Sequence, residues 1–140
     1  MSTDTPAMAF IMALSALESR LAKRIDQQLS IHGISYTEFI VMFHLQKAHA
    51  MTLRRTDLAA AVSLSPSGVT RMLRPMEKIG LVEKEINPRD ARVSLVRLSS
   101  GGQQIYADAL DSFKHGSASL VQALDKQQLE QGLELIGMIR

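Results

Sequence analysis

The sequence contains neither cysteine nor tryptophan, and aromatic residues make up only 4% of it. Without cysteine, the chain cannot carry a thiolate nucleophile, a disulfide, a cysteine-ligated zinc ion or a thiol redox switch. Long apolar runs are also missing: the longest, at residues 7–14, is far shorter than the roughly 20 residues that span a bilayer. The N-terminal MSTDTP has an acidic residue, Asp4, and no basic one, unlike a secretory signal. We therefore expect a cytoplasmic protein that does not contact a membrane.

The residues that are present describe one compact domain with helical extensions. Hydrophobic residues make up 46% of the 140, and a chain of this length can bury roughly two thirds of its unfolded surface. The net charge of +2 is unevenly spread. Residues 54–97 hold nine Lys and Arg against five Asp and Glu, whereas the remainder holds seven against nine. A basic middle between acidic ends favours a polyanionic partner, although ordinary scatter also produces such a difference.

The helical spacing of apolar residues predicts six helices. They are expected at residues 6–31, 36–48 and 54–62 and from residues 66, 100 and 126 onward. Their start signals are Thr5 before Pro6, Ser35 with Glu38, Ser65 before Pro66, Ser99, and Asp125 with Gln128. Side chains expected to face a core or another chain include Phe10, Leu14 and Leu17 of the first helix, Phe39, Ile40, Phe43 and Leu45 of the second, Ile105, Ala109, Phe113, Leu120 and Leu124 of the fifth, and Leu129, Leu133 and Ile136 of the last.

After Gly80 the apolar period changes from helical to alternating. Residues 81–86 and 93–98 alternate, and the turn-forming Asn87-Pro88-Arg89-Asp90 separates them. This pattern predicts a β-hairpin with a charged tip. The fold class is therefore mostly α with a small β-hairpin.

Residues 58–73 match the spacing of a helix-turn-helix. Ala59 is small enough for a second helix to approach closely, and Val69, ten positions later, fills the angle between the helices. Leu58, Val62, Leu64 and Leu73 complete a small core, and Ser63 replaces the glycine that is usual in the turn. A helix pair of this kind followed at once by a hairpin predicts a winged helix, whose second helix enters a DNA major groove.

The outer face of that second helix carries small polar groups and guanidinium groups. If Val69, Leu73 and Met76 are buried, the side exposed to solvent shows Ser67, Gly68, Thr70, Arg71 and Arg74. These residue types suit base edges and phosphates, and the helix N-terminus at residues 65–67 offers N–H groups to a phosphate. The alternative is an ordinary solvated face, which would more often mix Glu and Lys.

Residues 65–102, SPSGVTRMLRPMEKIGLVEKEINPRDARVSLVRLSSGG, resemble the DNA-binding core of the MarR family of bacterial transcriptional regulators. The resemblance lies in V-T-R at 69–71, E-K-x-G-L-V at 77–82, D-x-R at 90–92 and L-S-x-x-G at 98–102. Ser99 stands where threonine is commoner. The flanking helices match the family's plan over nearly the whole chain by pattern.

This resemblance implies a homodimeric transcriptional repressor that binds double-stranded DNA at a pseudo-palindromic operator, with half-sites roughly 10 bp apart. Residues 1–34 and 100–140 would form the helical dimerisation region, and residues 35–99 the winged helix-turn-helix. Arg92 at the wing tip would enter a minor groove, and Asp90 would hold it by a charge-assisted hydrogen bond. The alternative for this pair is an exposed ion pair with no further role. The predicted DNA-binding residues are Ser65, Ser67, Gly68, Thr70, Arg71, Arg74, Arg89, Asp90 and Arg92.

The resemblance also implies a small anionic aromatic effector bound between the dimerisation helices and the winged helix. The candidate residues are Phe10, Tyr36, Phe39, Phe43, His44 and Phe113, although Phe39 and Phe43 are also typical core residues. A regulator without a small-molecule inducer is the alternative. We expect no cofactor and no metal, because the four histidines form no i, i+3 or i, i+4 pair.

Other function classes fit the sequence less well. The chain has no G-x-G-x-x-G, H-E-x-x-H or G-x-S-x-G motif, so we expect no enzymatic activity. A winged helix used only for protein contacts would expose an apolar face on its second helix. RNA or single-strand binding would require stacking aromatics, and residues 54–97 contain none.

Overall fold

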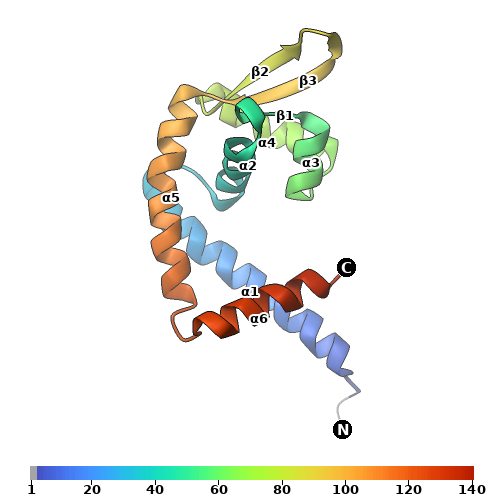
Figure 1. The fold of residues 1–140 in the computed structure, drawn as a ribbon, viewed down its shortest axis with the longest axis vertical. Helices are drawn as coiled ribbons and strands as arrows, with labels where there is room; N and C mark the ends of the chain where they lie inside the picture. The colour runs from blue at the N-terminus through green and yellow to red at the C-terminus, as the bar shows by residue number, and fades with distance from the viewer. Residues whose placement is uncertain (1–2) are drawn as a thin grey trace.

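The computed structural model describes residues 3–140, a mostly helical chain with one small sheet (Figure 1). Its elements are α1 (Pro6–Leu29), η1 (Ser30–His32), α2 (Tyr36–Lys47), η2 (His49–Met51), β1 (Thr52–Arg54), α3 (Arg55–Val62), α4 (Pro66–Lys78), β2 (Val82–Asn87), β3 (Asp90–Leu98), α5 (Ser100–Leu120) and α6 (Lys126–Met138). Helices α2, α3 and α4 and the sheet form one end of the molecule, from which α5 extends toward the end that holds α6 and the start of α1 (Figure 1). In the described residues, no helix is long and apolar enough to cross a membrane.

The predicted helix starts are confirmed by hydrogen bonds. Thr5 Oγ1 accepts from Met8 N at 3.2 Å, and Pro6 occupies the first turn of α1. Complete capping boxes open α2, at Ser35 and Glu38, and α6, at Asp125 and Gln128. These local signals predict the starts well because each one supplies an acceptor to an N–H that lacks a helical partner.

The sheet has one strand more than the predicted hairpin. Its order is β1-β3-β2, and both pairings are antiparallel. The strand β1 is only three residues long and follows Ala50 and Met51, which both have positive φ. Three residues show no alternation that a sequence pattern could detect, so the prediction missed this strand.

Helix α2 is buried on more than one side. The predicted inward position of Ile40 is wrong, whereas Phe43 is partly buried and packs against the core. Phe39 and Leu45 are buried as predicted, but Ile40 and Phe43 are only half-buried. Val41 and Met42 are fully buried in their place. The reason is that α2 contacts α5 along one side and α3 and the sheet along the other, so a single-stripe interpretation fails.

Two glycines let α5 pack closely. A β-carbon on Gly102 would lie 2.1 Å from the Leu81 carbonyl oxygen, and one on Gly116 would meet the Gln28 side chain. Ala109 is buried as predicted, and Tyr106 is buried beside it. The predicted inward position of Leu124 is wrong, because it lies beyond the end of α5 and is 45% exposed.

The apolar residues of α6 and the first half of α1 are not covered within one chain. Leu129, Leu133 and Ile136 are exposed and no described residue of α6 is buried, so one chain supplies no core for the side chains that were predicted to face a core or another chain. Phe10 and Leu17 of α1 are also exposed. Helix α6 and the first half of α1 lie away from the core, which α1 joins through Ile25 and Leu29 in its second half, so nothing in one chain covers their apolar residues (Figure 1).

Candidate nucleic-acid interface

The helix-turn-helix is built as the spacing predicts. Ser63 ends α3 in the left-handed region, at φ 57°, and Leu64 N donates to Ala59 O at 3.0 Å. From this turn α4 packs against α3, with Val69, Leu73 and Met76 buried. Leu58 is fully buried beneath them. The burial of these residues fixes which face of α4 is left for a ligand.

The first turn of α4 is held by side-chain hydrogen bonds. Ser65 Oγ accepts from Gly68 N at 3.1 Å and lies 3.2 Å from Ser67 Oγ. Thr70 Oγ1 donates to Pro66 O at 3.1 Å. The Gly68 N–H is thus already used, and Pro66 has none, so fewer N–H groups face outward here than the sequence suggested.

The remaining predicted residues of α4 lie on its outer side. Ser67, Arg71 and Arg74 are exposed, and Gly68 and Thr70 are half-buried. This face is polar and basic, whereas a helix used only for protein contacts would show apolar side chains. Guanidinium and hydroxyl groups at these positions can donate hydrogen bonds to base edges or phosphates.

The wing carries the predicted contact between Asp90 and Arg92. The Arg92 guanidinium donates through Nε to Asp90 Oδ1 at 3.1 Å and through an Nη to Oδ2 at 3.3 Å, and Arg92 N donates to Oδ1 at 3.0 Å. These hydrogen bonds, together with the charge of Arg54, lower the pKa of the Asp90 carboxyl from its usual value. Arg89 is exposed in the adjoining turn, where its N–H donates to Asn87 Oδ1. The Arg92 side chain is thus 91% exposed to solvent, while Asp90 holds its guanidinium and its backbone N–H.

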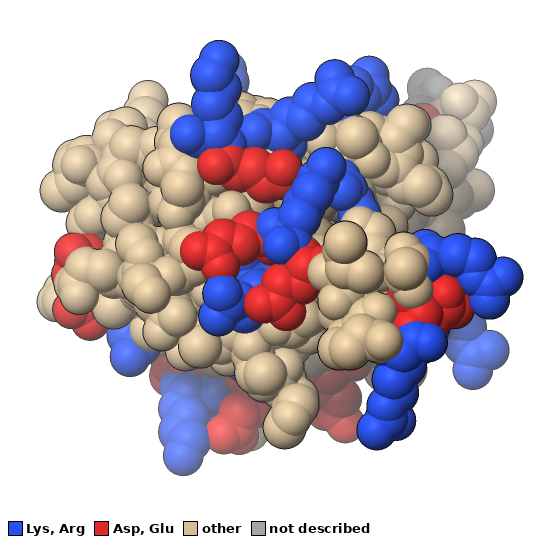
Figure 2. All heavy atoms as spheres, turned by 90° about the horizontal axis from the view of Figure 1, so that it is seen from above, with Lys and Arg blue, Asp and Glu red and all other residues tan. Residues whose placement is uncertain are grey.

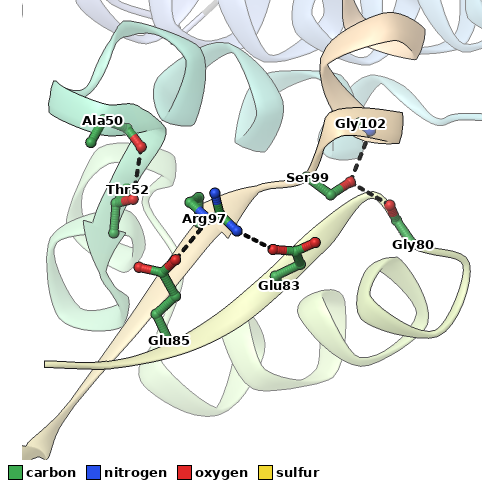
Figure 3. Close-up of polar contacts among 8 residues, drawn as sticks. All are labelled: Ala50, Thr52, Gly80, Glu83, Glu85, Arg97, Ser99 and Gly102. Atoms are coloured by element: carbon green, nitrogen blue, oxygen red, sulfur yellow. Dashed lines mark hydrogen bonds and ion pairs between the residues drawn. The ribbon is translucent and has the colours of Figure 1, made fainter.

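Other charges of the wing neutralise one another. Arg97 of β3 pairs with Glu83 and Glu85 of β2, and the Glu85 contact is 2.7 Å (Figure 3). Lys84 Nζ lies 4.0 Å from Glu77 Oε2. Seen from above, acidic side chains lie among basic ones over the middle of this end (Figure 2). The excess positive charge of residues 54–97 is therefore carried by the α3 start, α4 and the wing tip, where seven Lys and Arg stand against Asp57, Glu77 and Asp90.

Two arginines, Arg54 and Arg55, lie beside this face of α4. They add to the basic charge of residues 54–97, but no motif in the sequence singled them out. Arg54 and Arg55 precede and begin α3, which has no side-chain cap within the described residues. An Arg55 Nη donates to Thr70 Oγ1 at 3.4 Å, which joins the start of α3 to the outer face of α4. The signal in the sequence was two adjacent cations at a helix N-terminus, where the helix dipole disfavours them.

Most of the predicted effector residues line one cavity. It has a volume of about 220 Å³ and is lined by Tyr36, Phe39, Ile40, Phe43, His44 and Phe113. Phe10 does not line it and is 47% exposed on the outer half of α1, which corrects its predicted place near α2. The sequence could not place Phe10, because the stripe of α1 continues past the point where α5 covers it. Phe39 is both a core residue and part of the cavity wall.

The cavity joins apolar walls to a few polar groups. Phe113 stacks between Phe39, at 4.8 Å, and Tyr36, at 6.0 Å between ring centroids. Burial and the negative charge of Glu18 raise the pKa of Tyr36, so its hydroxyl stays protonated and able to donate a hydrogen bond. Lys47 Nζ lies 4.3 Å from the centroid of the Phe43 ring. Such a site fits a single-ring compound, because drug-sized ligands need roughly 300–1,000 Å³. Across residues 3–140, no three His, Asp or Glu side chains gather as metal ligands would.

The chain is similar to known DNA-binding regulators. The model of the MarR family matches residues 34–94. The uncharacterized HTH-type transcriptional regulator YhbI of Bacillus subtilis is 26% identical over 89% of this chain and 79% of its own. The transcriptional repressor MprA of Escherichia coli is 25% identical over 82% and 67%. A mutant MarR of Escherichia coli, solved with operator DNA, superposes with a TM-score of 0.88 at 21% identity and covers 98% of this chain and 97% of its own. The matched proteins are transcriptional regulators and not enzymes.

Proposed function

Because the chain belongs to the MarR family through its winged helix-turn-helix, we propose that it is a homodimeric repressor that binds double-stranded operator DNA in the cytoplasm. In this proposal residues 35–99 bind the DNA, and residues 1–34 and 100–140 join the two copies. The binding residues are Ser65, Ser67, Gly68, Thr70, Arg71, Arg74, Arg89, Asp90 and Arg92.

One observation carries the DNA-binding part. Arg55 donates to Thr70 on the outer face of α4 and lines the same cleft as Arg92 of the wing. The polar face of α4 and the wing arginine are therefore parts of one continuous surface. Such a surface can contact a major groove through α4 and the adjoining minor groove through Arg92.

The relatives support the proposed repression and the proposed binding of operator DNA. MprA is a transcriptional repressor, and the superposed MarR was solved with operator DNA. Repression by this chain would follow if its operator overlaps a promoter. The exposed apolar residues of α1 and α6 support a dimer, because a second copy of the chain would bury them. Two-fold symmetry then requires a pseudo-palindromic operator with half-sites roughly 10 bp apart.

Arg71→Ala tests the proposed reading of bases. The operator is first identified by sequencing the genomic fragments that the purified protein retains. We then expect the variant to lose about five- to hundredfold in affinity for that operator and little for a random duplex, because a bidentate arginine–guanine contact discriminates by about 1–3 kcal/mol. Titration of both duplexes at one salt concentration measures the ratio.

Lys126→Ala is the matched control, since it removes one exposed cation from α6, far from α4. Equal losses on the two duplexes for Arg71→Ala would make Arg71 a phosphate contact. A wild-type protein that retains no symmetric sequence would refute the proposed function itself.

We further propose that the aromatic cavity binds a small aromatic acid that lowers operator affinity. Aromatic walls would hold the ring, and the Tyr36 hydroxyl and the nearby Lys47 ammonium would meet the carboxylate. The cavity lies between α2 of the winged helix and α5 of the proposed dimerisation region. A ligand there shifts DNA binding only if it prefers one relative position of these helices.

Benzoate is expected to weaken operator binding by at least about fivefold at saturation, the lower range of typical coupling between sites. Fluorescence anisotropy of a labelled operator measures this change. Benzyl alcohol, which lacks the charge, serves as the control ligand. Ile40→Trp fills the cavity and should remove the response while the affinity without benzoate stays unchanged. A response that persists in Ile40→Trp would place the effector elsewhere.

A further inference from the structure

A cleft lined by three arginines separates the start of α3 from the wing. Its volume is about 310 Å³, and its lining residues are Arg54, Arg55, Thr56, Arg92, Val93 and Ser94. Arg54 belongs to β1, Arg55 to α3 and Arg92 to β3, so three different elements each supply one arginine to the cleft. We call this hollow the arginine cleft.

The charge of the arginine cleft is not compensated by its own residues. Asp90 is the acidic group that pairs with Arg92 and feels the charge of Arg54, and none of the six lining residues is acidic. Counting Asp90, the site keeps a net charge of +2. Arg97 is different, because Glu83 and Glu85 neutralise it on the sheet (Figure 3). Three clustered guanidiniums repel one another, and an anion between them relieves that repulsion.

The groups around the arginine cleft suit a phosphate. A guanidinium can donate two parallel hydrogen bonds to two oxygens of one phosphate. Thr56 and Ser94, which also line the cleft, carry hydroxyl groups that can donate further hydrogen bonds. The first N–H groups of α3 point toward its N-terminal end, where no described side chain caps them. The cleft is not enclosed, so a phosphodiester can enter without a free end.

Arg55 links this cleft to the face that reads bases. Arg55 lines the cleft, and its guanidinium donates to Thr70 Oγ1. Thr70 in turn donates to Pro66 O in the first turn of α4. An anion that fixes Arg55 therefore fixes the position of Thr70 as well.

We propose that the arginine cleft binds one phosphate of the DNA backbone and so sets the wing and α4 in a single register on the duplex. Arg54 holds the phosphate, Arg92 lines the other wall of the cleft while its guanidinium reaches the minor groove, and Arg55 is a positioning residue that connects the cleft to Thr70. This inference rests on the proposed function, since it assumes that the duplex lies across α4 and the wing. A free phosphate compound has the same chemistry, so the test separates the two sources.

The test measures operator affinity against salt for the wild type, Arg54→Gln, Arg55→Gln and the control Lys126→Ala. One lost phosphate contact lowers the steepness of the log–log salt dependence by about 0.9. We expect this decrease for Arg54→Gln, with equal weakening on operator and random duplex, and no decrease for the control. Arg55→Gln should lose steepness and also discrimination between the two duplexes, which a merely structural role would not change. Arg54→Lys retains the charge and should restore most of the steepness.

Several outcomes would overturn the proposal. An unchanged salt dependence in Arg54→Gln, with normal circular dichroism, means that the cleft holds no backbone phosphate. If the wild type, but not Arg54→Gln, binds inorganic phosphate in calorimetry and the salt dependence is unchanged, the ligand is a free phosphate compound. If the wild type binds no duplex, the proposed function fails before this test begins.

Discussion

Arg92→Ala is expected to weaken operator binding by about ten- to a hundredfold while leaving the fold and the oligomeric state unchanged. The Arg92 side chain is 91% exposed and its guanidinium contacts only the exposed Asp90, so its loss should not destabilise the chain. It is also proposed to supply both the minor-groove contact and one wall of the arginine cleft, which is why the effect on affinity is large. Electrophoretic mobility shift with the operator, alongside sedimentation and thermal unfolding, measures the three quantities.

Asp90→Asn distinguishes the effect of how Arg92 is positioned from the effect of the wing's net charge. The substitution makes the wing more positive, so general attraction alone would strengthen DNA binding. If instead Asp90 holds Arg92 in place, binding should weaken despite the added charge, because two guanidinium hydrogen bonds become weaker. Arg89→Ala, in the adjoining turn, shows what any wing-tip cation contributes. Unchanged affinity in Arg92→Ala would remove the wing from the proposed mechanism.

Gly102→Ala is expected to lower the free energy of unfolding by about 3 kcal/mol or more, beyond the usual range for added methyl groups in a core. The new β-carbon would lie 2.1 Å from Leu81 O and 2.9 Å from a Leu98 methyl carbon. The carbonyl belongs to the backbone, which also accepts from Ser99 N, so it cannot move aside without breaking the junction of wing and α5. Urea titration at one fixed protein concentration measures the change.

Gly101→Ala is the control for that junction. Its β-carbon would come no closer than 3.6 Å to Gly80 O, an ordinary contact. Because alanine is the better helix former, this variant should be neutral or stabilised by up to about 1 kcal/mol. Similar destabilisation of both variants would show that helix entry in general, and not the close approach at Gly102, limits stability.

The sequence predicts the helices of this fold better than it predicts burial. Caps such as Ser35 with Glu38 act over three residues, so they can be found without knowing the fold. Burial depends on which elements meet, and α2 meets neighbours on several sides, which is why Val41 was missed and Ile40 was misassigned. The strand β1 escaped because its three residues are defined only by their pairing with β3.

The candidate site divides in the same way. Motif and spacing predicted the site residues that lie close together in the sequence. Examples are the residues of α4 and the pair Asp90 and Arg92. The contribution of Arg54 and Arg55 could not be predicted, because it depends on the sheet bringing β1 beside the wing. Phe10 failed for the opposite reason: its helix is correct, but the tertiary position of that half of α1 is not encoded locally.

The uncovered apolar side chains of α1 and α6 have a consequence for how the protein responds to its own abundance. Leu133 and Met138 are each more than 70% exposed in a single copy, and pairing of copies as proposed would remove them from water. Operator occupancy then rises with the square of the amount of free chain when copies are scarce. A modest fall in synthesis would empty the operator more than proportionally, so a DNA-binding dimer of this chain would switch more sharply with dose than a single-chain DNA binder of the same affinity.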